Sequence, residues 1–532
     1  MPTFAPFTDR LDVYVGDLKL ELHYVGPAHT TNDVVVWMPE RRLMFTGDIA
    51  FKGGTPFIVQ GSLVGHIAAC ERVREFGAEH IVPSHGSVCG PEALDDMLDY
   101  LRFVRHVART ATPSAAAGGT TAAGRHLRRD DRVQQRPHPL LRLATGREPM
   151  KLSTDRILTT HTGSLPRPEE LVKLTYAQEE GKPVDHPVMA AAQARAVEQV
   201  VRHQAEVGID VVSDGEMSKP GFTNYLTSRV TGYEGRAAPW VLDDLVEFPD
   251  LVMEQYGGEA GAHIVMRNCT GDIRYVGQDA VATDVAALSK AMSGVDVAEG
   301  FLPATSPGCF ALAAPNLHYD SYENYVFALA RALREEYRAI VQSGLLLQID
   351  CPDLPMAVHT SSWDNTSKRI GYQKYLELHV AALNEAVAGL PPDRMRMHIC
   401  WGNYLGPHHM DVDLTEVLPA VFEARPAAIL FEAANPRHEH EWEDLGKLTI
   451  PDGKVLIPGV VDVKTNVLEH PRLVAQRICW FADIAGRERV IAGTDCGFGT
   501  FAGFGAINDT VAWLKLGTLA QGARLATERL WR

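Results

Sequence analysis

Residues 345–400 contain three features in order: the apolar run LLLQID (Leu345–Asp350), the amphipathic pattern YQKYLELHVAALNEAVA (Tyr372–Ala388) and a second apolar run, MRMHIC (Met395–Cys400). Short apolar runs predict buried strands, and apolar residues spaced three and four apart predict helices. A strand, a helix and a strand in succession are typical of parallel sheets, because the chain must cross over between parallel strands. This stretch therefore predicts a β-α-β unit.

The same alternation extends over most of the chain after Met150. Helical patterns such as Tyr322–Ser343 separate six further apolar runs. These runs are RILTT (156–160), IDVVS (209–213), FLPA (301–304), AILFE (428–432), VLIPGVV (455–461) and VIAGT (490–494). Eight strands that alternate with helices predict an α/β fold, most simply a (β/α)8 TIM barrel. Residues 230–290 do not continue the alternation, and we expect an inserted hairpin or excursion there.

The rest of the chain divides at a change of composition. A length of 532 residues predicts two to four domains at roughly 100–200 residues each. Between Arg109 and Met150, runs of Ala, Gly and Thr and many arginines replace the hydrophobic pattern, as in a linker or a translated, formerly non-coding join. We predict an α/β segment at 1–108, a linker at 109–150 and the barrel at 151–532.

Charge and hydropathy exclude several classes of partner. The formal net charge is −16, and an acidic surface repels phosphate backbones, so we expect no nucleic-acid partner. No stretch approaches the ~20 apolar residues of a membrane span. The start MPTFAPFTDR lacks the basic and apolar regions of a signal peptide, so we expect a cytoplasmic protein. Eight cysteines are too few for a disulfide scaffold, which favours ligand roles for some of them.

Polar side chains follow several predicted strands directly, where barrel enzymes place their sites. His398 and Cys400 form an H-x-C triplet whose side chains share one side of a strand. Together with Cys496 and Glu432 they make a donor set suited to tetrahedral zinc. The alternative is a pair of packed core thiols and a surface carboxylate.

Seven motifs resemble one known superfamily. They are TTHTGSLPRP (159–168), GIDVVSDGE (208–216), LQIDCPD (347–353), MHICWGNY (397–404), ILFEAAN (429–435), PGVVDVKTN (458–466) and GTDCGFGTF (493–501). From about Arg156 onward the chain resembles the catalytic barrel of cobalamin-independent methionine synthases and their shorter relatives, which include epoxyalkane–coenzyme M transferase. The motif order is specific to the superfamily and less specific to one reaction within it.

The resemblance implies roles for the polar residues. It implies a Zn²⁺ ion held by His398, Cys400, Glu432 and Cys496 that activates a thiol, since coordination to a metal deprotonates it. It also implies that Gly163 and Ser164 hold the carboxylate of an amino-acid thiol, while Glu216 and Asp350 receive its ammonium group. Asp350 is thus a predicted catalytic as well as substrate-binding residue. Helix capping or a loop ion pair is the alternative for both acids, and His161 either contacts substrate or caps a turn.

Three functions remain open. The first is methyl transfer to homocysteine from a folate or a methylated carrier protein. The second is alkylation of coenzyme M or another thiol by an epoxide-type carbon. Lys464 favours the second, because it stands where the synthases have a proton-donating histidine, and a lysine can bind an anionic group or protonate an alkoxide. An ion pair with Asp462 is the alternative for Lys464. A zinc-stabilised protein with a dead site is the third function.

The first hundred residues resemble the second half of a metallo-β-lactamase-fold hydrolase. His29 in GPAHTTND, Asp48 in LMFTGD and His85 in IVPSHG match ligands of that family's dinuclear metal site. The H-x-H-x-D-H cluster that completes the site is absent from this sequence, so we expect vestigial ligands and no hydrolysis. A half-fold also leaves sheet and core uncovered, which predicts association with the barrel, with another chain or with a second copy as a homo-oligomer.

Two further histidine groups are interpreted as solvated loop. They are the pair His408 and His409, and the pair His438 and His440 with the glutamates around them.

Overall fold

The computed structural model describes residues 7–30, 33–52, 62–110, 148–237, 241–257, 261, 263–361 and 366–532. The chain divides into two compact units, 1–143 and 144–532, which are treated separately below. Most of the predicted linker, 111–147, lies outside the described residues.

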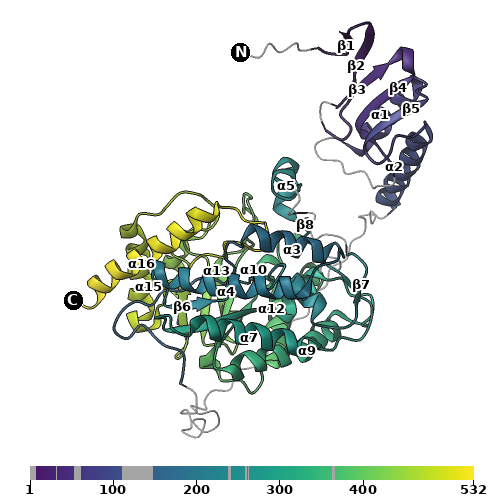
Figure 1. Ribbon diagram of the computed structural model, residues 1–532. Coiled ribbons are helices and arrows are strands. Elements are labelled where there is room, and N and C mark those ends of the chain that lie inside the picture. Colours follow the sequence, from purple (N-terminus) through teal and green to yellow (C-terminus); the bar gives the residue numbers. More distant parts are fainter. Residues whose placement is uncertain are drawn as a thin grey trace, which may run out of the picture. The chain divides into compact units, whose positions relative to one another are not determined.

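The first unit is a five-stranded sheet with two helices (Figure 1). Its strands pair in chain order, antiparallel except for the parallel pair β4–β5. Val35, Met44 and Ile81 are fully buried in its core, together with residues of both helices. The elements are β1 (Arg10–Val15), β2 (Leu18–Gly26), β3 (Asp33–Met38), β4 (Leu43–Phe51), α1 (Leu63–Glu75), β5 (His80–His85) and α2 (Glu92–Thr110).

The second unit contains a six-stranded sheet in the order β15-β14-β13-β11-β10-β6, in which every pairing is parallel. Its strands are almost wholly buried, which is why they read as continuous apolar runs in the sequence. The strands are β6 (Val211–Ser213), β10 (Glu299–Thr305), β11 (Leu346–Asp350), β13 (Met395–Ile399), β14 (Ala428–Phe431) and β15 (Val455–Pro458). Each lies within or around one predicted run.

The other two predicted strands are present only as isolated bridges. Thr159 bridges Ala492 in parallel, and Val490 and Gly493 bridge Leu456 and Gly459 beside β15. On the opposite side, the amide of Val211 in β6 donates to the carbonyl oxygen of Thr159 at 3.0 Å. Both segments therefore pair at the outer edges of the sheet. The α/β class with a curled parallel sheet is confirmed for this unit.

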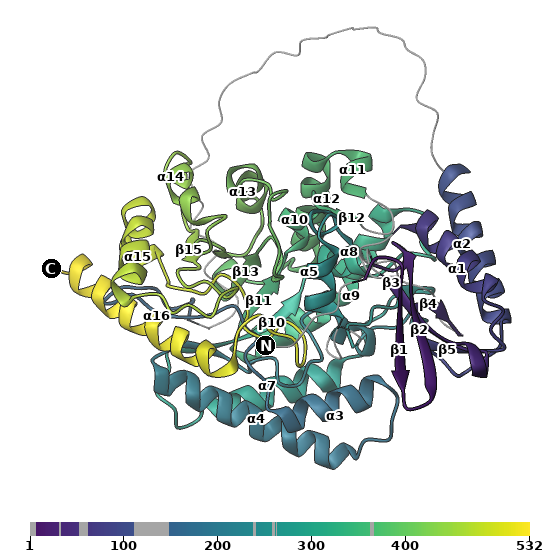
Figure 2. The same ribbon diagram turned by 90° about the horizontal axis from the view of Figure 1, so that it is seen from above.

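Helices surround this sheet, as Figure 2 shows. The predicted helix at 322–343 is α9 (Tyr322–Ser343): Ser321 caps its first turn and Gly344, at φ +99°, ends it. The remaining helices are α3 (Glu169–Glu179), α4 (His186–Val207), α5 (Pro249–Tyr256), α7 (Gln278–Met292), α8 (Pro307–Ala313), α10 (Asp353–Met356), α11 (Thr366–Ile370), α12 (Tyr372–Ala386), α13 (Leu414–Phe422), α14 (Trp442–Leu445), α15 (Pro471–Ala485) and α16 (Asp509–Leu530). Among the described residues, no helix is long and apolar enough to cross a membrane.

The excursion predicted at 230–290 is shorter than expected. Within it, β7 (Tyr233–Glu234) pairs antiparallel with β9 (Asn268–Cys269). Its β8 (Val241–Leu242) pairs antiparallel with β12 (Thr360–Ser361), which lies outside the excursion. Residues 278–292 instead form α7, which precedes β10 as an ordinary helix of the alternation. Figures 1 and 2 together place α5, from this excursion, above one end of the strands.

Candidate active site

The ends of neighbouring parallel strands bring the predicted polar residues together. Asp350 ends β11, and its register partner on β13 is His398. Ile399 on β13 pairs with Phe431 on β14, so Cys400 and Glu432 each follow a strand end at the same edge. Cys496 comes three residues after the bridge at Gly493. Carboxyl ends of parallel strands meet at one edge, which explains how residues from 350 to 496 converge.

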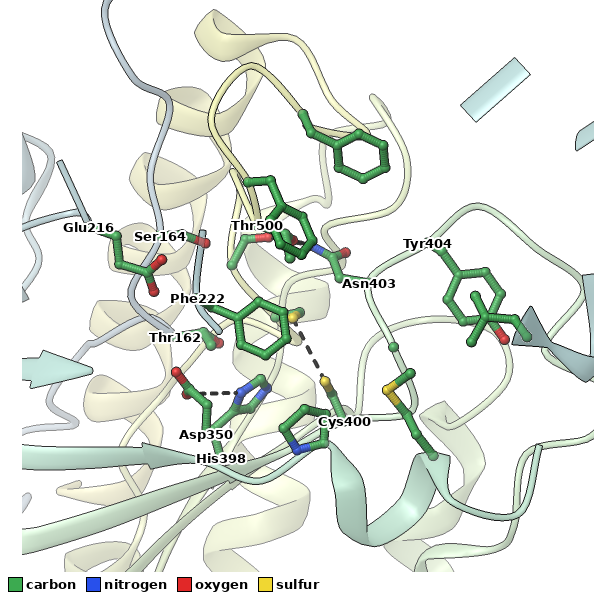
Figure 3. A pocket seen from close by; sticks show the side chains of 18 of the residues that line it. Thr162, Ser164, Glu216, Phe222, Asp350, His398, Cys400, Asn403, Tyr404 and Thr500 are labelled. Carbon is green, nitrogen blue, oxygen red and sulfur yellow. Dashed lines mark hydrogen bonds and ion pairs between the residues drawn. The ribbon is translucent and has the colours of Figure 1, made fainter. Parts of the chain in front are cut away.

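His398, Cys400 and Cys496 form a compact cluster. One ligand atom from each lies within 4.8 Å of the others, and all three side chains are buried. The two sulfur atoms are 4.0 Å apart, and His398 Nδ1 is 3.4 Å from Asp350 Oδ1 (Figure 3). In the described part of the chain His398 Nε2 has no hydrogen-bond partner despite its burial. An orphaned imidazole nitrogen beside two thiols fits a metal ion that accepts nitrogen and sulfur ligands.

The electrostatics of the cluster agree with that fit. Burial alone would lower the pKa of His398, but Cys400 and Asp350 outweigh it and raise that pKa to about 10. For Cys400, the contact with Cys496 and burial together raise the pKa of the thiol well above its ordinary value. Burial thus penalises a thiolate here unless a cation lies next to it.

Glu432 lies beside the cluster but outside the 4.8 Å group. Its Oε2 accepts from Lys464 Nζ at 2.8 Å and its Oε1 from the backbone amide of Trp401, the residue after Cys400. Burial favours a higher pKa for Glu432, but Lys464 holds that pKa below its usual value. Lys464 is thus paired with Glu432 rather than with Asp462, whose side chain accepts only from the Lys464 backbone amide.

Asp495, which was not singled out in the sequence, fixes the loop behind the cluster. Its carboxylate accepts from the backbone amides of Ala433, Ala434 and Asn435 at 2.8–2.9 Å. It precedes Cys496 and the loop follows Glu432, so one side chain links the two strand ends. No pattern in the sequence marked this aspartate, because partners that orient metal ligands are defined by their position in space.

A pocket opens above the cluster and contains most of the predicted substrate residues. Ser164, Glu216 and Asp350 line it together with the three cluster residues. Gly163 (φ +149°) lies against Glu216: a Cβ there would be 3.3 Å from Glu216 Oε1. Figure 3 shows Glu216 and Asp350 on the same side of the pocket.

Glu216 is the least satisfied acid of the pocket. It adopts φ +59°, a conformation that non-glycine residues rarely take. Its buried Oε2 has no hydrogen-bond partner among the described residues, and Arg167 Nη2 is 3.6 Å away. Burial raises the pKa of Glu216 to about 7. A carboxylate held in this way is available to a cationic group of a ligand.

The structure places His161 away from this pocket. Its Nε2 lies 2.7 Å from Gln204 Oε1, and its ring packs against Phe301 with centroids 5.5 Å apart. His161 is fully buried, and burial lowers its pKa to about 4. His161 does not line the pocket, and its Nε2 bonds to the side chain of Gln204 on α4 instead of capping a turn.

Sequence reasoning missed the aromatic wall of the pocket. Phe222, Phe501, Phe504 and Tyr256 line it and form a continuous chain of rings. The centroid distances are 5.7 Å for Phe222–Phe501, 6.2 Å for Phe501–Phe504 and 5.3 Å for Tyr256–Phe504. These residues lie in loops and at one helix end, so no periodicity revealed them.

The interpretation of two histidine groups as solvated loop was wrong for His408 and His438. Both are buried, because Asp411 pairs with each of them: its Oδ2 lies 2.9 Å from His408 Nδ1 and 3.0 Å from His438 Nε2. His440 is exposed, as expected. The buried group does not form a compact ligand cluster like that of His398.

In the first unit, two of the three predicted ligands lie together. His29 Nε2 is 3.4 Å from Asp48 Oδ2. The side chain of His85, at the end of β5, lies outside the described residues.

Comparisons with known proteins agree with this division. Residues 5–85 match the family described as the metallo-beta-lactamase superfamily. A methionine synthase of Thermococcus kodakarensis is 24% identical over 388 residues, covering 70% of this chain and 94% of that protein. A 2-hydroxypropyl-CoM lyase of Xanthobacter autotrophicus is 24% identical over 372 residues, covering 63% and 85%.

A solved structure shares the fold. The B12-independent methionine synthase of Shewanella sp. W3-18-1, in complex with selenomethionine, has a TM-score of 0.56 at 20% identity and covers 71% of this chain and 99% of that one. The resemblance of the second unit to cobalamin-independent methionine synthases and their coenzyme M relatives is therefore confirmed. So is the resemblance of the first unit to the metallo-β-lactamase superfamily.

Proposed function

We propose that the second unit is a zinc-dependent S-alkyltransferase that acts on a thiol. One observation carries the proposal: His398, Cys400 and Cys496 cluster within 4.8 Å at the base of a pocket that also holds two carboxylates. Two thiols and an imidazole are ligands that zinc prefers. A bound zinc ion supplies a positive charge that lets a thiol ionise at neutral pH. The relatives named methionine synthase and 2-hydroxypropyl-CoM lyase support this reaction class.

Glu432 is proposed as the fourth, exchangeable ligand. A carboxylate is a harder donor than a thiolate and so the poorer match to zinc. The hydrogen bond from Lys464 would stabilise the Glu432 carboxylate when a thiol substrate displaces it from the metal. The role of Lys464 in this proposal is to hold Glu432, with no direct contact to substrate.

We favour an amino-acid thiol of the homocysteine type as the nucleophile. Glu216 and Asp350 offer carboxylates to an ammonium group, and Ser164 offers a hydroxyl to a carboxylate. Among the described residues that line the pocket, none is a lysine or arginine, which an anionic sulfonate would require. Lys464 is bonded to Glu432 and is not among these lining residues, which supports an amino-acid thiol over coenzyme M. Alkylation of coenzyme M is the second candidate, supported by the lyase relative.

For the fold, we propose that the segments around Thr159 and 490–493 complete an eight-stranded barrel. They lie next to the two edge strands, β6 and β15, and Thr159 bridges Ala492 directly, so these pairings would close the sheet. The proposed boundaries remain 1–108, 109–150 and 151–532. The first unit is proposed to be a vestigial metallo-hydrolase segment.

The test is zinc analysis of the full chain with X-ray absorption at the zinc edge. We expect one zinc per chain with two sulfur ligands, and a third sulfur after addition of homocysteine but not of coenzyme M. A third sulfur from coenzyme M alone would select the second candidate. A protein without zinc would leave an uncharacterised enzyme. A zinc shell that neither thiol changes would leave a zinc-binding protein with a dead site.

A further inference from the structure

We propose that the alkyl donor of this enzyme is an onium cation: a methylated sulfonium or a quaternary ammonium compound. The inference rests on the proposed function, because it names the second substrate of the same pocket. It starts from the four-ring chain of Phe222, Phe501, Phe504 and Tyr256, which forms one wall of the pocket beside the cluster. Aromatic faces attract cations through their quadrupoles, most strongly where water is excluded.

The charges of the pocket point to the same class. Its acidic residues are Glu216 and Asp350, and no lysine or arginine occurs among the described lining residues. The buried lining atoms that lack a hydrogen-bond partner, again among described residues, are Glu216 Oε2, Asn403 Oδ1 and His398 Nε2. Two of these are oxygen acceptors, and the nitrogen belongs to the candidate metal cluster. Carboxylates and an aromatic wall favour a cation and disfavour a donor with a phosphate or polycarboxylate tail.

The placement of proton donors gives an independent reason. A neutral amine or an epoxide oxygen leaves carbon readily only when a general acid protonates it. Lys464, the candidate acid from the sequence, is bonded to Glu432 and does not line the pocket. Glu216 receives the ammonium group in the proposed function and is then held as a carboxylate. The remaining lining groups are weak donors: the hydroxyls of Ser164 and Thr500, and the phenols of Tyr256 and Tyr404, whose pKa values burial raises. The Tyr404 hydroxyl moreover already donates to Asp244.

An onium donor needs no acid. The sulfur of the thiol substrate attacks the methyl carbon, and a sulfur–carbon bond forms. The carbon–sulfur or carbon–nitrogen bond of the donor breaks, and its electron pair remains on the leaving atom. The donor leaves as a neutral thioether or tertiary amine, while the acceptor becomes a thioether. The only proton involved is the one that the thiol has already lost.

A binding experiment tests the inference without turnover. The probes are choline and its uncharged carbon analogue 3,3-dimethylbutan-1-ol, which differ in charge and hardly in shape. With the zinc-loaded full chain, isothermal titration is expected to show at least tenfold tighter binding of choline. Equal affinities would mean that the wall is merely apolar and would overturn the inference, as would the absence of any binding by choline.

Variants locate the site. Phe501→Leu keeps an apolar side chain and is expected to weaken choline at least fivefold while changing the affinity of the neutral analogue less than twofold. Phe248→Leu is the matched control, because Phe248 lies outside the pocket lining. Choline affinity unchanged by Phe501→Leu would place the cation elsewhere and contradict the proposal.

A second assay separates this inference from the proposed function. Homocysteine is incubated with ¹³C-methyl-labelled S-methylmethionine, and labelled methionine is followed by NMR. Labelled product supports both proposals. Thiol alkylation by an epoxide or a methylfolate, with none from the sulfonium compound, would retain the function and overturn the onium donor. Selective choline binding by a chain that alkylates no thiol would retain the cation site and overturn the function.

Discussion

The two thiols of the cluster lie 4.0 Å apart, close enough to bind one metal ion together. Cys400→Ser and Cys496→Ser replace soft sulfur with hard oxygen, so each variant is expected to lose most of the bound zinc. Metal content after gel filtration checks this. Cys479→Ser, outside the cluster, is the control and is expected to keep a full equivalent. Full zinc in both cluster variants would refute the site.

Glu216 predicts a pH dependence of stability. Burial raises its pKa from 4.5 to about 7, so the folded protein keeps a proton that the unfolded chain releases between these pH values. Stability therefore falls as the pH rises from about 4.5 to about 7. Each pKa unit corresponds to about 1.4 kcal/mol, which puts the loss near 3 kcal/mol.

The amide in Glu216→Gln stays neutral at every pH. We expect the variant to exceed the native chain in free energy of unfolding by up to about 3 kcal/mol at pH 8, and to match it near pH 4. Urea denaturation across this range measures the difference. Glu254→Gln, at an exposed position on α5, should give no such trend. Parallel curves for native and Glu216→Gln chains would show that Glu216 does not titrate as proposed.

Lys464 and Glu432 form a buried ion pair at 2.8 Å. In the metal-free chain, Lys464→Ala leaves the Glu432 carboxylate without a cation, which is expected to cost about 3–5 kcal/mol of unfolding free energy. The zinc-loaded variant is expected to retain its metal. Denaturation of the metal-free chain and metal analysis of the loaded chain measure the two effects. Lys447→Ala removes an exposed partner of Asp444 and should leave the free energy of unfolding nearly unchanged. Similar costs for the two variants would contradict a buried pair.

At the scale of elements, Asp495 joins two strand ends through three backbone amides. Asp495→Asn keeps the shape of the side chain but replaces one carboxylate oxygen with an NH2 group. That NH2 group is a donor and would face backbone amides, which are donors too. We expect zinc affinity to fall about 10- to 100-fold, as for other residues that orient a ligand, while both thiols remain. Competition with a chelator measures the affinity. Asp509→Asn, at the exposed start of α16, is the control, and equal affinities would remove this role from Asp495.

Prediction from the sequence was most successful where an element is continuous and buried. Runs such as Leu345–Asp350 and Met395–Cys400 became β11 and β13 because both faces of a parallel strand are apolar. The run at 156–160 forms an isolated bridge at Thr159 and a few backbone hydrogen bonds to its neighbours, which is less pairing than a strand has. Strand ends located the cluster residues and Glu216, but rotamers and long-range packing placed His161 against Gln204 and Lys464 against Glu432. A single sequence does not reveal these contacts.

At the scale of the whole molecule, the two units have separate buried cores. Calorimetry of the full chain should therefore show two unfolding transitions. Met44 and Met397 are both fully buried, one in each unit. Met44→Ala should destabilise one transition by about 2–5 kcal/mol, and Met397→Ala the other. A single transition that both variants shift together would show that the units unfold as one.

The excursion, residues 230–277, contributes Leu242 and Tyr256 to the pocket wall. It contributes none of the three cluster residues and neither pocket acid, which all lie at or near strand ends. Of the four aromatic residues that line the pocket, the excursion supplies Tyr256, while Phe222, Phe501 and Phe504 come from loops outside it. Changes within residues 241–257 would therefore alter one end of the aromatic wall and leave the residues proposed to activate the thiol in place.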